Sequence, residues 1–313
     1  MPRLENIEEK LFKGFKVDKE NKDVIYSDEP HIYLGKQDGD KYISVTTLIK
    51  NYENPFDTFF WSSYKTCERL LSEEVFSVLK QTLLTTKKWT DDMISKLNLD
   101  VDLFEKTRLE IQKEYDDNRI KSCERGTKIH AELENIYYEK SEHDLKKFGL
   151  GGKFACKKGY YELDMDKGIY PEFLISLKSR DNLLKVAGQI DLLIKDGDEI
   201  TIIDYKTNKE IKKKSYYDSN TKTNLMMKYP LNNLMDCNYY HYTLQLSLYA
   251  YLLQQINPNF IIKSLQLYHI DHDGKSKTYH LDYLKDDVVR MLKHYKKILK
   301  QTSVLDRDKP IVF

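Results

Sequence analysis

The pattern of apolar and polar positions divides the chain into a mainly helical first third and a later region that mixes strands with helices. Apolar residues recur at helical spacing from Phe56 to about Cys123 and again after Gly126. Short apolar runs bounded by turn residues then predict strands at 171–179, 184–195, 199–206 and 261–270. Helices are predicted at 237–256 and 284–301, and a strand pair at 24–48. This order of helices and strands predicts a mixed α/β core.

We therefore expect two regions. Residues 1–115 would hold the strand pair and a helical region that forms a wall or arch guiding a substrate, and residues 116–313 would hold the α/β core with its C-terminal helix. Within the core, residues 141–168 read as a polar connector and residues 207–236 as a long polar segment.

The most informative stretch runs from Gly188 to Lys206 and reads as two apolar strands joined by a glycine turn. Asp191 lies in the first strand, and Asp204 and Lys206 end the second. Because strand side chains alternate, Asp204 and Lys206 should point to one side of the sheet and Tyr205 to the other. A lone D-x-K at a strand end is usually a solvated edge pair, but Asp191 interrupts an apolar set, where an unpaired carboxylate is costly to bury. Carboxylates and a lysine converging there suit a hard divalent cation and a water nucleophile, as in phosphodiester cleavage.

Other residues have both an ordinary and a functional interpretation. His130 and Glu134 share a helix face, so His130 could bind a metal ion while Glu134 orients it, or both could be ordinary helix residues. Glu172 at the start of a predicted strand is either an exposed charge or an acidic group of the metal pocket. Gln245 and Tyr249 lie one turn apart on an apolar helix, where the glutamine needs a partner such as a phosphate, a base or the lysine.

The formal net charge of +1 does not indicate a nucleic-acid partner, so a binding surface must be sought in local clusters of charge. The segment 206–228 holds seven lysines and two acids, with Tyr216 and Tyr217 between the lysines. It is either a solvated loop or a surface that grips a phosphate backbone. Gly126 would allow close approach of a phosphate.

Composition narrows the class of protein. No apolar run approaches the ~20 residues of a membrane span, and the first ten residues lack the apolar core of a signal peptide. The four cysteines form no C-x-x-C pair and no zinc-ligand spacing. We therefore expect reduced thiols and a location in the cytoplasm, or wherever the nucleic acid is replicated, with no membrane partner.

Five ordered motifs resemble those of the PD-(D/E)XK nuclease superfamily, and in particular the branch of the RecB nuclease domain, Cas4 and the mitochondrial genome maintenance exonuclease. They cover about residues 125–250 and are G-x-x-x-H, P-E, G-x-x-D, D-Y-K and Q-x-x-x-Y. In this sequence they are Gly126/His130, Pro171/Glu172, Gly188/Asp191, Asp204/Tyr205/Lys206 and Gln245/Tyr249.

The resemblance implies a restriction-endonuclease-like core, in which a mixed central sheet is flanked by helices, and a role for each matching residue. His130, Asp191 and Asp204 would ligate Mg²⁺, for which Mn²⁺ would substitute, together with the Tyr205 carbonyl. Lys206 would orient or deprotonate the attacking water, Glu172 would assist the metal site, and Gln245 and Tyr249 would support the lysine and the DNA. We assign DNA binding to Gly126, Thr127, Tyr249, Lys209, Lys212, Lys213 and Lys214.

One departure from the family pattern concerns cysteine. No cysteine follows Cys237, so the iron–sulfur cluster of Cas4 is not expected. No helicase motif is present, and we expect a stand-alone nuclease with a role in DNA replication, recombination or repair, in a virus or phage to judge from the Lys, Asn, Tyr and Ile content.

The expected function is a Mg²⁺-dependent exonuclease that acts on DNA ends or single strands. Two alternatives remain open, which are a structure-specific or nicking endonuclease on the same fold and a non-catalytic nucleic-acid-binding protein.

Overall fold

The computed structural model describes residues 16–86, 88–158, 162–218 and 221–307, and the chain forms two compact units. The first unit contains the residues up to Asn54 and those from Lys128 onward, and the second is Pro55–Thr127. These boundaries differ from the expected division at residue 115, because the N-terminal strands belong with the α/β core. The first ten residues, examined above for a signal peptide, lie outside the described residues.

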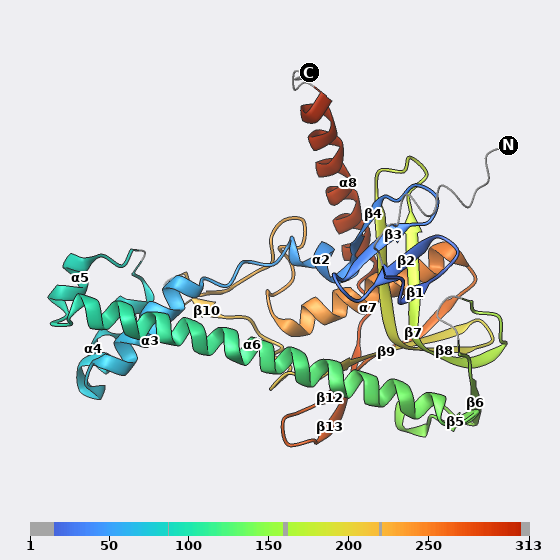
Figure 1. Ribbon diagram of the computed structural model, residues 1–313, viewed down its shortest axis with the longest axis horizontal. Helices are drawn as coiled ribbons and strands as arrows, with labels where there is room; N and C mark the ends of the chain where they lie inside the picture. Colours follow the sequence, from blue (N-terminus) through green and yellow to red (C-terminus); the bar gives the residue numbers. More distant parts are fainter. Residues whose placement is uncertain (1–15, 87, 159–161, 219–220, 308–313) are drawn as a thin grey trace. The chain divides into compact units, whose positions relative to one another are not determined.

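A mixed sheet forms the centre of the first unit (Figure 1). Its strands are β1 (Lys19–Glu20), β2 (Val24–Ser27), β3 (Ile32–Gly35), β4 (Lys41–Ser44), β5 (Glu142–Asp144), β6 (Lys153–Cys156), β7 (Lys167–Lys178), β8 (Lys185–Asp196), β9 (Glu199–Lys206), β12 (Ile261–Ile270) and β13 (Ser276–Leu281). Along the main path the order is β1-β2-β3-β4-β8-β7-β6-β5, with β9 joined to β8 and β12, and β13 joined to β12. A separate small ribbon pairs β10 (Tyr217–Asp218) with β11 (Thr223–Asn224).

The long strand β8 is the branch point of this sheet. One edge pairs with β7 along almost its whole length. The opposite edge pairs with two strands in succession, in parallel with β4 at residues 186–187 and antiparallel with β9 at residues 192–196. Residues 188–191 of β8 therefore lie in a fork between β4 and β9.

Helix α7 (Asn238–Ile256) supplies the largest apolar face to the sheet. It packs against β7, β9 and β12 and also contacts α2 (Val45–Lys50) and α8 (Lys285–Arg307) (Figure 1). Leu244, Leu248 and Leu252 are fully buried in the main core with residues of β7, β8 and β9. Each such side chain stabilises the fold by roughly 1.5–3 kcal/mol relative to an exposed position. The expected mixed α/β architecture, a sheet flanked by helices, is confirmed.

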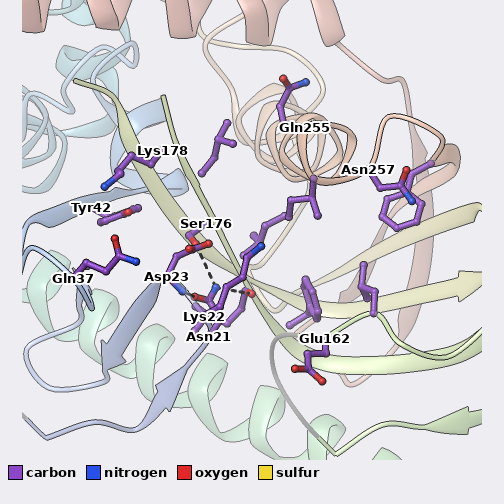
Figure 2. Close-up of a pocket in the computed structure, with 18 of the residues that line it drawn as sticks. Asn21, Lys22, Asp23, Gln37, Tyr42, Glu162, Ser176, Lys178, Gln255 and Asn257 are labelled. Atoms are coloured by element: carbon purple, nitrogen blue, oxygen red, sulfur yellow. Dashed lines mark hydrogen bonds between the residues drawn. The ribbon is translucent and has the colours of Figure 1, made fainter. Parts of the chain in front are cut away.

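The N-terminal strands are anchored to the core by polar contacts. The buried side chain of Asn21, in the turn after β1, donates from Nδ2 to the Leu174 carbonyl and to Ser176 Oγ, both at 3.3 Å (Figure 2). Its Oδ1 accepts hydrogen bonds from the next residues of the same turn. This side chain therefore fastens the β1–β2 turn to β7.

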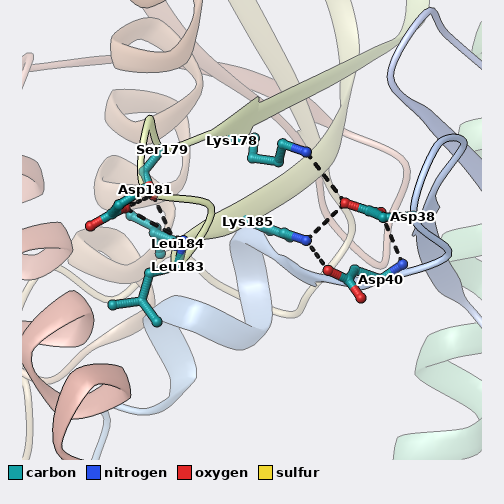
Figure 3. Close-up of polar contacts among 8 residues, drawn as sticks. All are labelled: Asp38, Asp40, Lys178, Ser179, Asp181, Leu183, Leu184 and Lys185. Atoms are coloured by element: carbon teal, nitrogen blue, oxygen red, sulfur yellow. Dashed lines mark hydrogen bonds and ion pairs between the residues drawn. The ribbon is translucent and has the colours of Figure 1, made fainter. Parts of the chain in front are cut away.

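A second anchor joins the β3–β4 turn to β7 and β8. Lys185 pairs with Asp38 at 3.0 Å and with Asp40, and Lys178 lies 3.3 Å from Asp38 (Figure 3). Burial raises the pKa of Asp38, but the hydrogen bonds from Lys185 and from the Asp40 backbone outweigh it and lower the pKa to about 2. Together the two anchors explain why the predicted strand pair joins the α/β core.

The second unit is helical. It consists of α3 (Thr58–Leu70), α4 (Glu73–Leu84), α5 (Asp91–Lys96) and the first part of α6 (Val101–Tyr138). The side chains of Asp57, Ser72 and Thr90 cap the first three helices by accepting a backbone hydrogen bond. Its core contains Cys67, Leu83, Ile94 and Phe104.

Three sequence expectations about elements were wrong. Helix α6 is continuous, so Gly126 lies inside a helix and does not precede one, although a helical glycine costs roughly 1 kcal/mol relative to alanine. The connector 141–168 contains β5 and β6. Glu172 lies in the middle of β7 and not at its start.

Among the helices of the described residues, none combines the length and the apolar character needed to cross a membrane.

Candidate metal and catalytic site

The candidate site forms in the fork where β8 and β9 separate. The last antiparallel pair between these strands is Leu192 with Ile203. Beyond it, the Asp191 side chain enters the gap, and its Oδ2 accepts a hydrogen bond of 2.7 Å from the Tyr205 backbone N–H. The carboxylate thus satisfies a backbone donor that the diverging strand has left without a strand partner, which fixes its position.

Glu172 faces Asp191 from the neighbouring strand β7. The register pairs Pro171 with Leu192 and Phe173 with Ile190, which sets Glu172 opposite Asp191. Glu172 has a φ of 50°, a left-handed conformation that is uncommon for a residue with a Cβ. Together with His130 these two residues form a group whose ligand atoms all lie within 4.8 Å of one another.

His130 reaches the same place from α6. Its Nε2 donates to the Tyr205 carbonyl at 3.0 Å, and its Nδ1 lies 3.5 Å from Asp191 Oδ2. Burial lowers the pKa of His130, and its effect exceeds that of the Asp204 charge, which acts in the opposite direction. The lowered pKa favours the neutral imidazole, the form that binds metal ions. The Tyr205 carbonyl, an expected metal ligand, therefore lies within hydrogen-bond distance of His130.

Asp204 and Lys206 point to the same side of β9, as their spacing predicted, and form an ion pair. Asp204 is 1% exposed, and its Oδ1 accepts a hydrogen bond of 2.9 Å from Gln245 Nε2 on α7. The Lys206 ammonium also lies 4.7 Å from the centre of the Tyr242 ring, a cation–π contact. Gln245 therefore has the buried partner that it required, and that partner is Asp204 and not Lys206.

The positive groups of the site do not fully compensate the buried carboxylates of Asp191 and Glu172, whose pKa values are raised. Burial, followed by the charge of Asp204, raises the pKa of Asp191 to about 8. Burial, followed by the charge of Asp191, raises the pKa of Glu172 to about 7. Burial alone would lower the pKa of Lys206, but Asp204 and Asp191 outweigh it and raise the pKa above its usual value. A cation at this position would remove the penalty on both carboxylates.

The donor set fits a hard divalent cation. Two carboxylates, an imidazole and a backbone carbonyl are ligands that Mg²⁺ and Mn²⁺ accept. The compact group comprises His130, Glu172 and Asp191, whereas the expected ligand set contained Asp204 in place of Glu172. The two oxygens of Asp204 are engaged by Gln245 and Lys206, which explains the difference.

Two further residues lie at the site, and neither belongs to the motifs identified in the sequence. Lys19 of β1 lies 3.0 Å from Glu172 Oε2, although no motif marks it. Tyr242 lies under Lys206, and its position three residues before Gln245 on the same helix was the available signal.

The structure does not support direct DNA contact by Tyr249, which we expected from the sequence. Its side chain is 3% exposed and packs against Gly188, where an added Cβ would lie 2.8 Å from Tyr249 Cε1. Gly126 and Thr127 lie on α6 in the second unit.

The lysine-rich segment begins at Lys206, the last residue of β9, and ends at Lys228, before the start of α7 at Asn238. Its lysines 209, 212, 213 and 214 are exposed. Lys213 lies over the Tyr239 ring at 5.0 Å, and the backbone N–H of Lys212 donates to Asn238 Oδ1.

The chain was also compared with known proteins. The family model of the PD-(D/E)XK nuclease superfamily matches residues 150–306. A search of curated proteins found none that matches the sequence. Among solved structures, SSO0001 is 14% identical with a TM-score of 0.30, covering 77% of this chain and 89% of its own. A candidate exonuclease from Eubacterium rectale is 12% identical with a TM-score of 0.33, covering 83% of this chain and 80% of its own.

Proposed function

The chain belongs to the PD-(D/E)XK nuclease superfamily, and we propose that it is a metal-dependent DNA nuclease that hydrolyses phosphodiester bonds. One observation carries this proposal, which is the meeting of Glu172, Asp191 and His130 beside the Asp204–Lys206 pair. Nucleases of this superfamily generally use divalent metal ions. The ordered motifs favour the branch of RecB, Cas4 and the mitochondrial exonuclease.

The proposed ligands are His130, Glu172, Asp191 and the Tyr205 carbonyl, with Asp204 available from the adjacent strand, and the proposed ion is Mg²⁺ with Mn²⁺ as a substitute. A divalent ion supplies Lewis acidity toward a phosphate oxygen and lowers the pKa of water. Lys206 would hold the attacking water and stabilise the negative charge that develops on the phosphate. Gln245 would keep Asp204 oriented toward Lys206.

The lysine-rich segment is the proposed contact surface for DNA. Lys209, Lys212, Lys213 and Lys214 are exposed next to the strand that carries Asp204 and Lys206. Exposed Tyr216 and Tyr217 add faces on which bases can stack. Gly126 and Thr127 remain proposed DNA contacts on α6.

We favour an exonuclease that acts on ends or single strands. The catalytic side chains are recessed, since those of Asp191, Glu172 and Lys206 are 12%, 14% and 17% exposed. A recessed site admits a single strand or a frayed end more easily than an uninterrupted duplex. An endonuclease on the same fold is the main alternative, and a non-catalytic DNA-binding protein is the other.

The direct test is cleavage of 5′- and 3′-labelled linear DNA with Mg²⁺, with and without a chelator. We expect cleavage that requires the metal ion and is abolished by Asp191→Asn, which keeps an acceptor for the Tyr205 N–H but removes the charge. Asp273→Asn is the matched control, because Asp273 is an exposed carboxylate in the β12–β13 turn. Cleavage that survives the chelator or Asp191→Asn would contradict the proposal, and absence of cleavage by the wild type would favour the non-catalytic alternative.

A further inference from the structure

We propose that Lys19 of β1 is a positioning residue for Glu172, so that the N-terminal strands complete the candidate metal site. The inference rests on the function proposed above. It concerns a residue that belongs to none of the sequence motifs and lies in the region 1–115, which the sequence placed outside the core.

The first observation is a largely buried ion pair. Lys19 Nζ lies 3.0 Å from Glu172 Oε2, and each side chain is 14% exposed. Removing two charged groups from water is unfavourable, so a pair of this kind contributes little net stability, whereas loss of one partner leaves the other buried without a counter-charge. The contact is therefore better explained by control of the Glu172 side chain than by stabilisation of the fold.

The second observation is the way in which the chain delivers Lys19. Asn21, two residues later, is buried and binds the β7 backbone at Leu174 and the Ser176 hydroxyl. Figure 2 shows this turn, with Asn21, Lys22 and Asp23, at the wall of a pocket of about 770 Å³ beside β7. Lys19 also pairs with Tyr26 of β2. The backbone near Lys19 is therefore held by this strand pairing and by the Asn21 contacts with β7. Its ammonium group is thus held against one particular position of β7.

The third observation is the conformation of Glu172 itself. Its left-handed φ of 50° interrupts an otherwise extended strand and sets its carboxylate in the group with Asp191 and His130. Uncommon backbone conformations of this kind persist where surrounding contacts impose them. Asp191 repels the Glu172 carboxylate, and the ion pair with Lys19 restrains that carboxylate against the repulsion.

Two possible roles of Lys19, positioning a ligand and acting only as a nearby positive charge, predict opposite changes in metal affinity when Lys19 is removed. A lysine that acted only as a nearby positive charge would repel a divalent ion, so its removal would strengthen binding. A lysine that positions a ligand would, on removal, weaken binding. The sign of the change in Mn²⁺ affinity therefore separates the two roles.

The experiment is Mn²⁺ calorimetry without DNA, together with cleavage kinetics, on Lys19→Met, Lys19→Arg, Glu172→Gln and the double variant Lys19→Met/Glu172→Gln. We expect Lys19→Met to weaken Mn²⁺ binding about 10-fold, at the lower end of the range for residues that orient metal ligands. It should lower kcat to a similar extent and leave KM for DNA nearly unchanged. Lys19→Arg should recover most of both losses, and Lys22→Met, a neighbouring exposed lysine, is the control.

The double variant is decisive, because Lys19→Met should add little in the Glu172→Gln background if Lys19 acts through Glu172. Multiplicative effects of the two substitutions, or tighter Mn²⁺ binding by Lys19→Met, would overturn the inference. A wild-type protein that neither binds Mn²⁺ nor cleaves DNA would instead overturn the proposed function, and the inference with it. Thermal unfolding of each variant verifies that a loss of binding is not a loss of fold.

Discussion

The carboxylates of Glu172 and Asp191 lie in one compact group and are largely buried, so protons compete with any metal ion for them. A carboxyl group is protonated below its pKa, and these pKa values are raised to about 7 and about 8. At neutral pH the metal-free site therefore holds protons that a divalent ion must displace. The lowered pKa of His130 adds no further proton near neutrality.

We predict that Mn²⁺ affinity rises as the pH increases from about 6 and levels off above the raised pKa values, near pH 9, because ligands must be deprotonated to bind. Calorimetry in two buffers with different heats of ionisation measures the protons released per ion bound, and that number should fall with increasing pH. Asp191→Asn should reduce proton release. Affinity that is independent of pH between 6 and 9, with no proton release, would contradict the electrostatic description of the site.

Lys206 should contribute to chemistry more than to metal binding. An ammonium group is a hydrogen-bond donor and cannot ligate a cation, but it can stabilise negative charge on water and on the phosphate. We predict that Lys206→Ala still binds Mn²⁺ while cleaving DNA at least ~100-fold more slowly, the usual scale for loss of such a group. Single-turnover cleavage kinetics combined with Mn²⁺ calorimetry make the measurement. A variant that cleaved at the wild-type rate would remove Lys206 from the proposed mechanism.

The packing of α7 against β8 depends on the absence of a side chain at Gly188. A Cβ there would lie 2.8 Å from Tyr249 Cε1 and 3.2 Å from Val45 Cγ2, both on residues buried in the core. We predict that Gly188→Ala destabilises the protein by ~1–3 kcal/mol, the usual penalty for overpacking a core. Urea denaturation measures this change.

The matched control for that measurement is Gly151→Ala. An added Cβ at Gly151 would have no atom within 4 Å, so its stability should change by less than about 0.5 kcal/mol. Equal stabilities of the Gly188→Ala variant and the wild type would mean that α7 can shift away from β8 without penalty.

The pattern of apolar and polar residues was sufficient to predict features that depend on a single strand or helix. Strand β9 was predicted at its observed bounds, and alternation placed Asp204 and Lys206 on one side of it. The polar character of Gln245 in an apolar helix correctly indicated a buried partner. What local pattern could not supply was the register between strands, which places Glu172 of β7 opposite Asp191 of β8.

The errors have a common physical origin in contacts between distant parts of the chain. Strand β4 joins the core by a parallel pairing with β8, more than 140 residues later, which no local signal reports. Strands β5 and β6 are only three and four residues long, so their sequences read as part of a connector. Lys19 reaches Glu172 across 153 residues of sequence, from a strand whose following turn Asn21 fastens to β7. Residues that act across such contacts were the ones that the sequence did not reveal.

The distribution of charge along the chain favours one local surface for binding a phosphate backbone, because the protein as a whole is almost neutral. The formal net charge is +1, while the segment from Lys206 to Lys228 concentrates seven lysines against two acids. Contacts with phosphates position a nucleic acid but carry no sequence information. A nuclease that relies on such contacts should therefore cleave with little preference for sequence.

The recessed site and this proposed phosphate-binding surface together predict the kind of DNA that is degraded. The side chains of Asp191, Glu172 and Lys206 are each less than one-fifth exposed, so a strand must bend or enter by an end to bring a phosphate to them. We predict degradation of linear DNA with a free or frayed end and resistance of covalently closed circles. The measurement is a time course with Mg²⁺ on a linear plasmid, the same plasmid in closed form, and a single-stranded circle, with Asp191→Asn as the control for contaminating nucleases. Cutting of either circle at the rate of the linear DNA would favour the endonuclease, because a site that needs an end cannot begin on a molecule that has none.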